Sequence, residues 1–142
     1  MNERNLKQSV IFQIKECMDA FDVLKEVNII YKDLFIAPFN KRLPFRRELV
    51  APLLGVVRDD FSIRLACLFD KRKDVHSLKK YFKGLEINRL EKHPVTKDCV
   101  KARHGNIAHL GKKFVKWPEV ENIINSNIRE LLEMIYCGVL LS

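Results

Sequence analysis

Residues 9–35, SVIFQIKECMDAFDVLKEVNIIYKDLF, decide the fold class of this chain. Their large side chains recur at steps of three and four residues, which is the spacing of one face of an α-helix. The segment therefore predicts a long amphipathic helix, for which Ser9 is a suitable N-cap and Pro38 a stop. The predicted buried stripe comprises Ile14, Met18, Phe21, Leu24, Asn28, Tyr31 and Phe35.

The same spacing recurs along the rest of the chain. It predicts helices near 49–69, with Pro52 in the first turn, from Ser77 through Leu85, over 97–110 with Thr96 as the cap, and onward from Pro118. Connections between them are short, and no segment alternates with the period of a strand. We therefore expect an all-α antiparallel bundle of about five helices, forming one domain over residues 1–142.

Composition agrees with a globular protein that folds without metals or disulfides. The chain is 47% hydrophobic and 31% charged, and it contains only 5 Gly and 5 Pro. None of its 4 Cys forms a Cys-x-x-Cys pair, and their apolar neighbours predict buried thiols in a reducing compartment. The polar N-terminus and the lack of a long apolar run predict a cytoplasmic protein with no membrane segment. We expect neither a cofactor nor a metal site.

Positive charge is concentrated in the middle of the chain. Residues 71–116 carry 14 Lys and Arg against 4 Asp and Glu, whereas the whole chain has a net charge of +8. Such a field favours a polyanion such as RNA, although a solvated lysine-rich surface would have the same composition. The residues expected to contact RNA are Lys71, Arg72, Lys101, Lys112, Lys113 and Lys116.

One basic segment also carries groups suited to catalysis. In KARHGNIAHL, residues 101–110, Arg103, Asn106 and His109 are three residues apart. On an α-helix each such step turns by about −60°, so the three would share a sector about 120° wide. His104 would lie about 100° from Arg103 on the other side.

These residue types suit the cleavage of RNA without a metal. Imidazole can accept or release a proton near neutral pH, and a guanidinium can hold a phosphate on which negative charge develops. His109 would assist attack by a ribose 2′-hydroxyl or protonate the leaving oxygen, Arg103 would hold the phosphorane, and Asn106 would orient an oxygen. A solvated Arg–His pair on a basic helix is the alternative interpretation.

The segment from Arg103 to His109 resembles the Arg-x4–6-His motif of the HEPN superfamily, in which a polar residue, here His104, often follows the Arg. Arg-His-Gly-Asn-Ile-Ala-His is similar to the form in AbiU-like proteins of phage abortive infection, and the block from Ser62 to Asp70, followed by Ser77-Leu78, is also similar. One departure from the resemblance is Gly105, which lies inside the predicted motif helix, where Gly costs up to about 1 kcal/mol relative to Ala and favours a bend or an early end.

The resemblance implies a homodimeric helical bundle whose two motifs face a shared cleft. It implies ribonuclease activity in a toxin or antiviral effector, with an antitoxin or regulatory protein as a possible partner. Because some members of the superfamily are inactive, two alternatives stay open: a module that binds RNA or nucleotide without cleavage, and a bundle that binds only proteins. The remaining polar and aromatic residues default to structure: Asp60 and Arg64 to an ion pair, His76 and His93 to solvated linkers, and Trp117, Tyr31 and Tyr81 to packing.

Overall fold

The computed structural model describes residues 3–36, 47–72, 75–108 and 115–142, in which seven α-helices and one π-helical turn occur and no strand is found. The prediction of an all-α bundle is confirmed, with seven helices rather than about five. In chain order, the elements are α1 (Glu3–Ile36), α2 (Arg47–Cys67), α3 (Leu78–Tyr81), α4 (Leu85–Lys92), α5 (Pro94–Arg103), the π-helical turn η1 (His104–Ala108), α6 (Val120–Ile124) and α7 (Ile128–Leu141).

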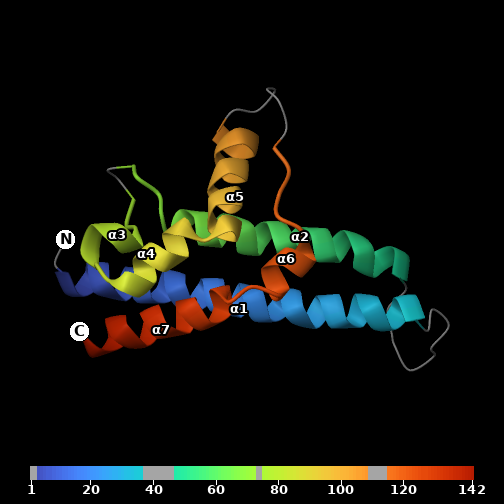
Figure 1. Ribbon diagram of the computed structural model, residues 1–142, viewed down its shortest axis with the longest axis horizontal. Coiled ribbons are helices and arrows are strands. Elements are labelled where there is room, and N and C mark those ends of the chain that lie inside the picture. Colours follow the sequence, from blue (N-terminus) through green and yellow to red (C-terminus); the bar gives the residue numbers. More distant parts are fainter. Residues whose placement is uncertain (1–2, 37–46, 73–74, 109–114) are drawn as a thin grey trace.

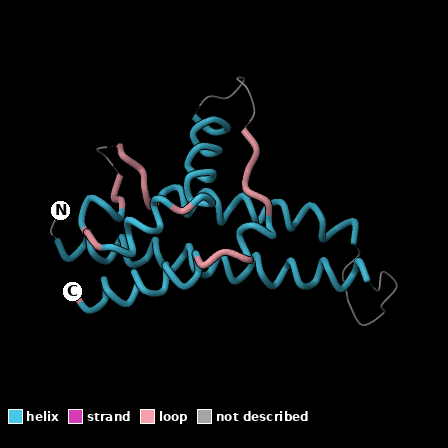
Figure 2. The backbone as a smooth tube through the Cα atoms, viewed as in Figure 1, coloured by secondary structure: helices cyan, strands magenta, loops and turns pink. Residues whose placement is uncertain are grey.

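Three helices form the body of the bundle. α1 and α2 lie side by side and run in opposite directions, and α7 packs along α1, also antiparallel to it (Figure 1). α4 packs against α7, and α5 stands across α2 with its C-terminal end away from the body (Figure 1). The tube in Figure 2 shows loop after α2, before α3 and leading into α6. The end of α5 and the segment after α2 therefore lie at the edge of the three-helix body.

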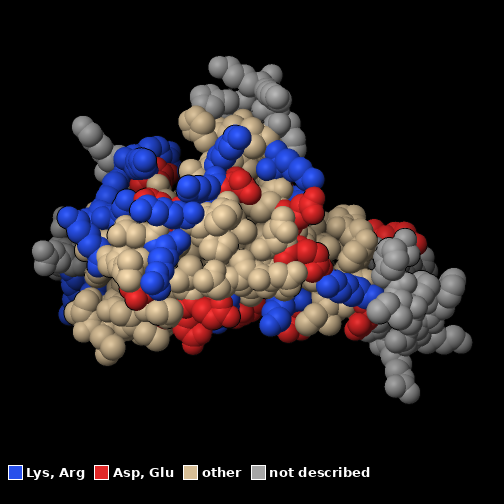
Figure 3. Space-filling view, viewed as in Figure 1, with Lys and Arg blue, Asp and Glu red and all other residues tan. Residues whose placement is uncertain are grey.

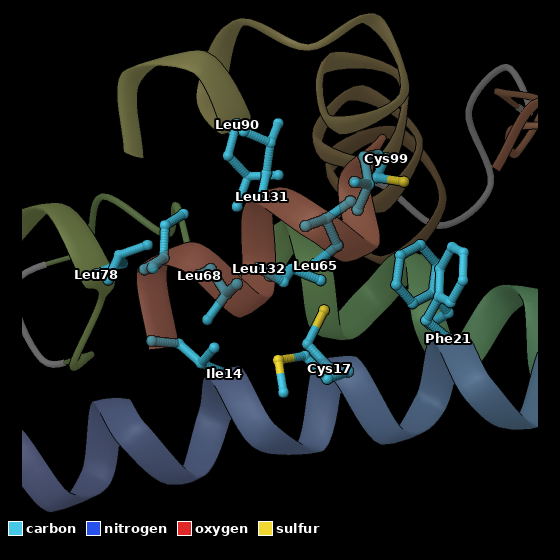
Figure 4. Close-up of a cluster of buried hydrophobic side chains, with 14 of the residues drawn as sticks. Ile14, Cys17, Phe21, Leu65, Leu68, Leu78, Leu90, Cys99, Leu131 and Leu132 are labelled. Carbon is cyan, nitrogen blue, oxygen red and sulfur yellow. The ribbon is translucent and has the colours of Figure 1, made fainter. Parts of the chain in front are cut away.

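The core is built from side chains of nearly every helix. Figure 4 shows Ile14, Cys17 and Phe21 of α1 facing residues of α2, α4, α5 and α7, among them Leu65, Leu90, Cys99 and Leu132. Phe21 and Phe61 pack edge to face with their ring centroids 5.6 Å apart. Each fully buried side chain of this size contributes about 1.5–3 kcal/mol by leaving water, so the apolar stripe read from the sequence is what holds the bundle.

The stripe on α1 is confirmed from Ile14 to Asn28, whereas Tyr31 is half-buried and the side chain of Phe35 lies outside the described part of the structure. The predicted start of the helix is wrong. Ile14, Met18, Phe21 and Leu24 are buried, whereas the helix begins at Glu3, six residues before the expected cap. Residues 3–8 contain no helix breaker and continue the helix at little cost. The Ser9 hydroxyl instead lies 3.1 Å from Nδ1 of His76, so His76 is not simply solvated.

α2 also starts earlier than expected. It begins at Arg47, so Pro52 lies in the second turn rather than the first. Its ring replaces an N–H that would have bonded to the carbonyl of Glu48, at an exposed position where water can solvate that oxygen. The predicted pair of Asp60 and Arg64 is present at 3.1 Å, and Arg64 also reaches Glu16 at 2.7 Å.

Two helices predicted as continuous are each broken in two. The segment from Ser77 to Leu85 divides into α3 and α4 around Gly84, which has low helix propensity. The last helix divides into α6 and α7 at residues 125–127, where Ser126 accepts a hydrogen bond from the Ile128 N–H at 3.4 Å and donates one to the Ile123 carbonyl at 2.6 Å. Short polar side chains of this kind compete with helical hydrogen bonds.

The N-cap of α5 is His93, not Thr96. Pro94 occupies the first turn, and Nδ1 of His93 accepts a hydrogen bond from the Val95 N–H at 3.1 Å. Nε2 of His93 lies 3.1 Å from Oδ1 of Asn127, which joins the start of α5 to the start of α7. Thr96 is fully buried inside the helix. His93, expected in a solvated linker, thus connects the starts of α5 and α7.

The thiols differ in burial more than expected. Cys17 and Cys99 are buried, Cys67 is half-buried, and Cys137 is exposed, so the prediction of four buried thiols fails for Cys137. Burial raises the pKa of Cys99 to about 12 and raises that of Cys17 further. Trp117 is buried as expected, whereas Tyr81 is 40% exposed and packs its ring edge to face with that of His76.

No helix in the described ranges has both the length and the apolar character needed to cross a membrane.

Candidate functional site

A cleft of about 620 Å³ lies where the segment after α2 meets the end of α5. Three of its lining residues are apolar, and the others are mostly basic. Four residues singled out in the sequence line it together, although two come from near residue 70 and two from near residue 103. The lining comprises Ala66, Phe69, Asp70, Lys71, Arg72, Val100, Arg103 and His104.

Asp70 organises the charges in this cleft. Asp70 is 8% exposed, and its carboxylate accepts hydrogen bonds from Arg72 and Arg103. Oδ2 lies 2.9 Å from Nη2 of Arg72 and 3.2 Å from Nη1 of Arg103, and Oδ1 accepts the Arg72 backbone N–H at 2.9 Å. The Arg72 side chain, helped by its backbone N–H and by the charge of Arg103, lowers the Asp70 pKa to about 2. The carboxylate is therefore ionised throughout the physiological range.

Arg103 is held at the edge of the cleft. It is the last residue of α5, and its side chain is 26% exposed. Its contact with Asp70 uses Nη1, one of the three guanidinium nitrogens. Asp70 carries one negative charge between two guanidinium groups, and Lys71 adds a further positive charge. The cleft keeps a net positive charge while one of its arginines is fixed in position.

The sequence analysis did not identify Asp70 as a candidate site residue. Two signals could have identified it. Asp70 directly follows the apolar residues Leu68 and Phe69, and it belongs to the block that resembles AbiU-like proteins. A carboxylate placed at the end of a buried stripe must be paired, because an isolated buried charge is costly.

The helix geometry changes within the motif. α5 ends at Arg103, and residues 104–108 form the π-helical turn. A π-helix closes its hydrogen bonds from i to i+5, so its side chains turn less per residue than in an α-helix. The regular α-helix predicted through this segment therefore ends at Arg103, and the angular relation predicted for Arg103 and Asn106 is wrong. His109 lies outside the described residues, whereas His104 lies in the same cleft as Arg103.

Gly105 and Asn106 explain why the chain turns here. A Cβ atom at Gly105 would lie 2.5 Å from Cγ2 of Val115, so only glycine permits this close approach. The Asn106 amide donates to the carbonyl of Val115, and its Oδ1 accepts the Val115 N–H at 2.7 Å. Asn106 thus has a structural contact where a contact with a substrate oxygen was expected.

The remaining predicted RNA contacts do not all gather in one place. Lys101 and Lys116 line a separate cleft of about 390 Å³ beside Trp117, where Lys116 pairs with Glu119 at 2.9 Å. Lys112 and Lys113 lie outside the described residues. Figure 3 shows the wider pattern: Lys and Arg side chains gather over the end of the molecule that holds α3, α4 and α5.

The described part of the chain holds no group of three or more His, Cys, Asp or Glu side chains placed to bind a metal ion. Comparison of the sequence with protein-family models and curated proteins, and of the structure with solved structures, finds no match. The fold and the cleft must therefore carry the functional argument.

Proposed function

We propose that this protein is a metal-independent endoribonuclease of the HEPN type, similar to AbiU-like proteins, that acts as a toxin or antiviral effector in the cytoplasm. RNA is the proposed substrate, and a homodimer is the proposed active form. The observation that carries the proposal is the cleft in which Arg103 is held by the buried carboxylate of Asp70 beside Lys71, Arg72 and His104.

This arrangement suits a phosphodiester. A guanidinium whose position is fixed before the substrate arrives loses less conformational entropy on binding, and it can stabilise charge that develops in the transition state. Lys71 and Arg72 would attract the neighbouring phosphates. The apolar lining residues Ala66, Phe69 and Val100 offer a surface on which a nucleobase can lie.

In the proposed reaction the ribose 2′-oxygen attacks the adjacent phosphorus as its proton passes to a base, for which His109 is the candidate. The bond from phosphorus to the 5′-oxygen breaks, and that oxygen receives a proton from an acid. The products are a 2′,3′-cyclic phosphate and a 5′-hydroxyl. Arg103 stabilises the charge on the non-bridging oxygens, and His104 is a second imidazole within the cleft.

One observation favours the alternative of a module that binds RNA without cleaving it. Asp70 already compensates part of the charge of Arg103 and Arg72, and the Asn106 amide is bonded to Val115. A cleft of this kind could hold a phosphate through Lys71 and the partly compensated arginines alone. The two functions share the same residues and differ in whether His109 or His104 transfers a proton.

Cleavage of labelled RNA in EDTA distinguishes the two functions. We expect cleavage by the wild type, and a loss of at least about 100-fold in Arg103→Ala and in His109→Ala, in line with removal of a charge stabiliser or a general acid–base group. His76→Ala is the matched control, because this imidazole contacts Ser9 outside the cleft. Binding without cleavage by the wild type would support the module instead. Full activity in both Arg103→Ala and His109→Ala would refute the proposed site.

A further inference from the structure

A second, smaller cleft adjoins the proposed site at the chain segment 69–71. Its volume is about 240 Å³, and it shares Phe69, Asp70 and Lys71 with the first cleft. Its other lining residues come from the start of α3 and from α4, namely Ser77, Lys79, Lys80 and Glu91. Because Lys71 lines both clefts, a ligand too long for the first can extend into the second past one lysine.

The charges of the second cleft favour an anion. Three lysines line it against two carboxylates, and Asp70 is already compensated by Arg72 and Arg103. Glu91 pairs with Lys79 at 2.8 Å, and both side chains are partly exposed. Lys71 has no hydrogen-bond or ion-pair partner within the described ranges. A phosphate would therefore find one uncompensated ammonium group and a second one shared with Glu91.

The wall of this cleft is held in place by specific contacts. Lys80 donates through Nζ to the carbonyl oxygen of Val75 at 2.7 Å and to that of Arg72. The Leu78 N–H donates to the carbonyl of Leu68 at 2.9 Å. Ser77 is only 2% exposed, makes no side-chain cap to α3 and is one of the residues that line the cleft. These contacts tie the segment that carries Lys71 to α3.

We infer that the second cleft is a phosphate subsite in which Lys71 and Lys79, with the Ser77 hydroxyl, bind the backbone of the same RNA strand beyond the phosphate held by Arg103. The inference rests on the proposed function. The strand crosses the segment 69–71, so the ligand is a single strand with several phosphates rather than a mononucleotide. Glu91 acts against this binding by competing for Lys79.

Binding of uncleavable 2′-O-methyl RNA tests the subsite separately from catalysis, because this RNA lacks the nucleophilic hydroxyl. Fluorescence anisotropy would compare a labelled mononucleotide with strands of two to eight nucleotides. For a single strand, each phosphate contact contributes a factor of about [salt]^−0.7 to the affinity, with the salt concentration in M. At 0.1 M salt, one contact therefore contributes about 5-fold. We expect Lys79→Ala to weaken binding of the eight-nucleotide strand by about 5-fold and to leave the mononucleotide unchanged.

Two further variants distinguish loss of the subsite from a general loss of folding. Glu91→Gln should strengthen binding of the long strand by a similar factor, since it releases Lys79, and a misfolded protein would not gain affinity. Lys25→Ala removes an exposed charge from α1, away from both clefts, and is the matched control.

Equal losses in Lys79→Ala and Lys25→Ala, weaker binding by Glu91→Gln, or an equal loss for the mononucleotide would overturn the subsite. A polyglutamate peptide that binds as tightly as RNA, with the same dependence on Lys79, would also overturn it. If the protein cleaves RNA but Lys79→Ala binds the eight-nucleotide strand as tightly as the wild type does, the subsite alone is refuted. Absence of RNA binding at every length would refute both the subsite and the proposed function.

Discussion

The body of the bundle and the cleft at its edge are built on different principles. Where α1, α2 and α7 meet, the contacts are apolar and fully buried, as for Leu24, Leu65 and Leu132. At the cleft, three charged side chains from residues 70, 72 and 103 hold one another at distances of 2.9–3.2 Å. The body gains its stability from area removed from water, whereas the cleft gains orientation from electrostatics, which is more sensitive to pH and salt.

The largest expected effect follows from opening a cavity in the body. Leu132→Ala removes a side chain that is 0% exposed, and we expect the free energy of unfolding to fall by about 2–5 kcal/mol. Urea denaturation followed by circular dichroism measures this loss. Val56→Ala, at an exposed position of α2, is the control and should change stability by less than about 0.5 kcal/mol. Similar losses in both variants would mean that α2 buries its outer face in an assembly.

The cleft should respond to acid, whereas the body should not. Asp70 has a pKa lowered from 3.8 to about 2, so its ion pairs stabilise the folded state above pH 3.8 and lose that contribution as the pH falls through about 2. We expect a contribution of about 1–2 kcal/mol at neutral pH, less than the full pKa shift implies, because Arg72 is mostly exposed and screened by solvent.

Asp70→Asn tests this contribution directly. The variant should be less stable than the wild type at pH 7, and the difference should shrink as the pH falls toward 2. Chemical denaturation at pH 7, 4 and 2.5 measures the difference. Asp59→Asn is a matched control, because Asp59 pairs with Arg58 on the surface of α2. A difference for Asp70→Asn that stays constant over this range would contradict the proposed ion pairs.

The contrast between body and cleft also explains what the sequence could predict. The stripe of Ile14, Met18, Phe21 and Leu24 was readable because helical periodicity and burial are local properties of one segment. The contact of Asp70 with Arg103 joins residues 33 positions apart, and no periodicity encodes it. The motif identified Arg103 and His104 as candidate site residues, and both line the cleft.

The errors within the motif have a physical reason as well. A regular α-helix over 97–110 was the natural expectation, but Gly105 lies against Val115 so closely that a Cβ atom would clash with it. This tertiary contact favours the π-helical turn over the local preference for an α-helix. The predictions of helix ends and breaks were wrong for a similar reason. Ser126 and His93 act through side-chain hydrogen bonds that residue spacing does not reveal.

The smallest expected effect concerns the junction that connects body and cleft. His93 caps α5 through the Val95 N–H and contacts Asn127 at the start of α7. We expect His93→Ala to lower the free energy of unfolding by about 1 kcal/mol, the usual loss for an N-cap, and His93→Asn to recover most of it, because Asn can accept the same backbone hydrogen bond.

Hydrogen exchange would localise the change: amides in the first turn of α5 should exchange faster in His93→Ala, while those of α1 keep their protection. Asn127→Ala removes only the contact to α7, so it should reproduce part of the loss without exposing the Val95 amide. If His93→Ala and Asn127→Ala gave identical exchange patterns, the histidine would act as a tether between two helices, and the start of α5 would not depend on its cap.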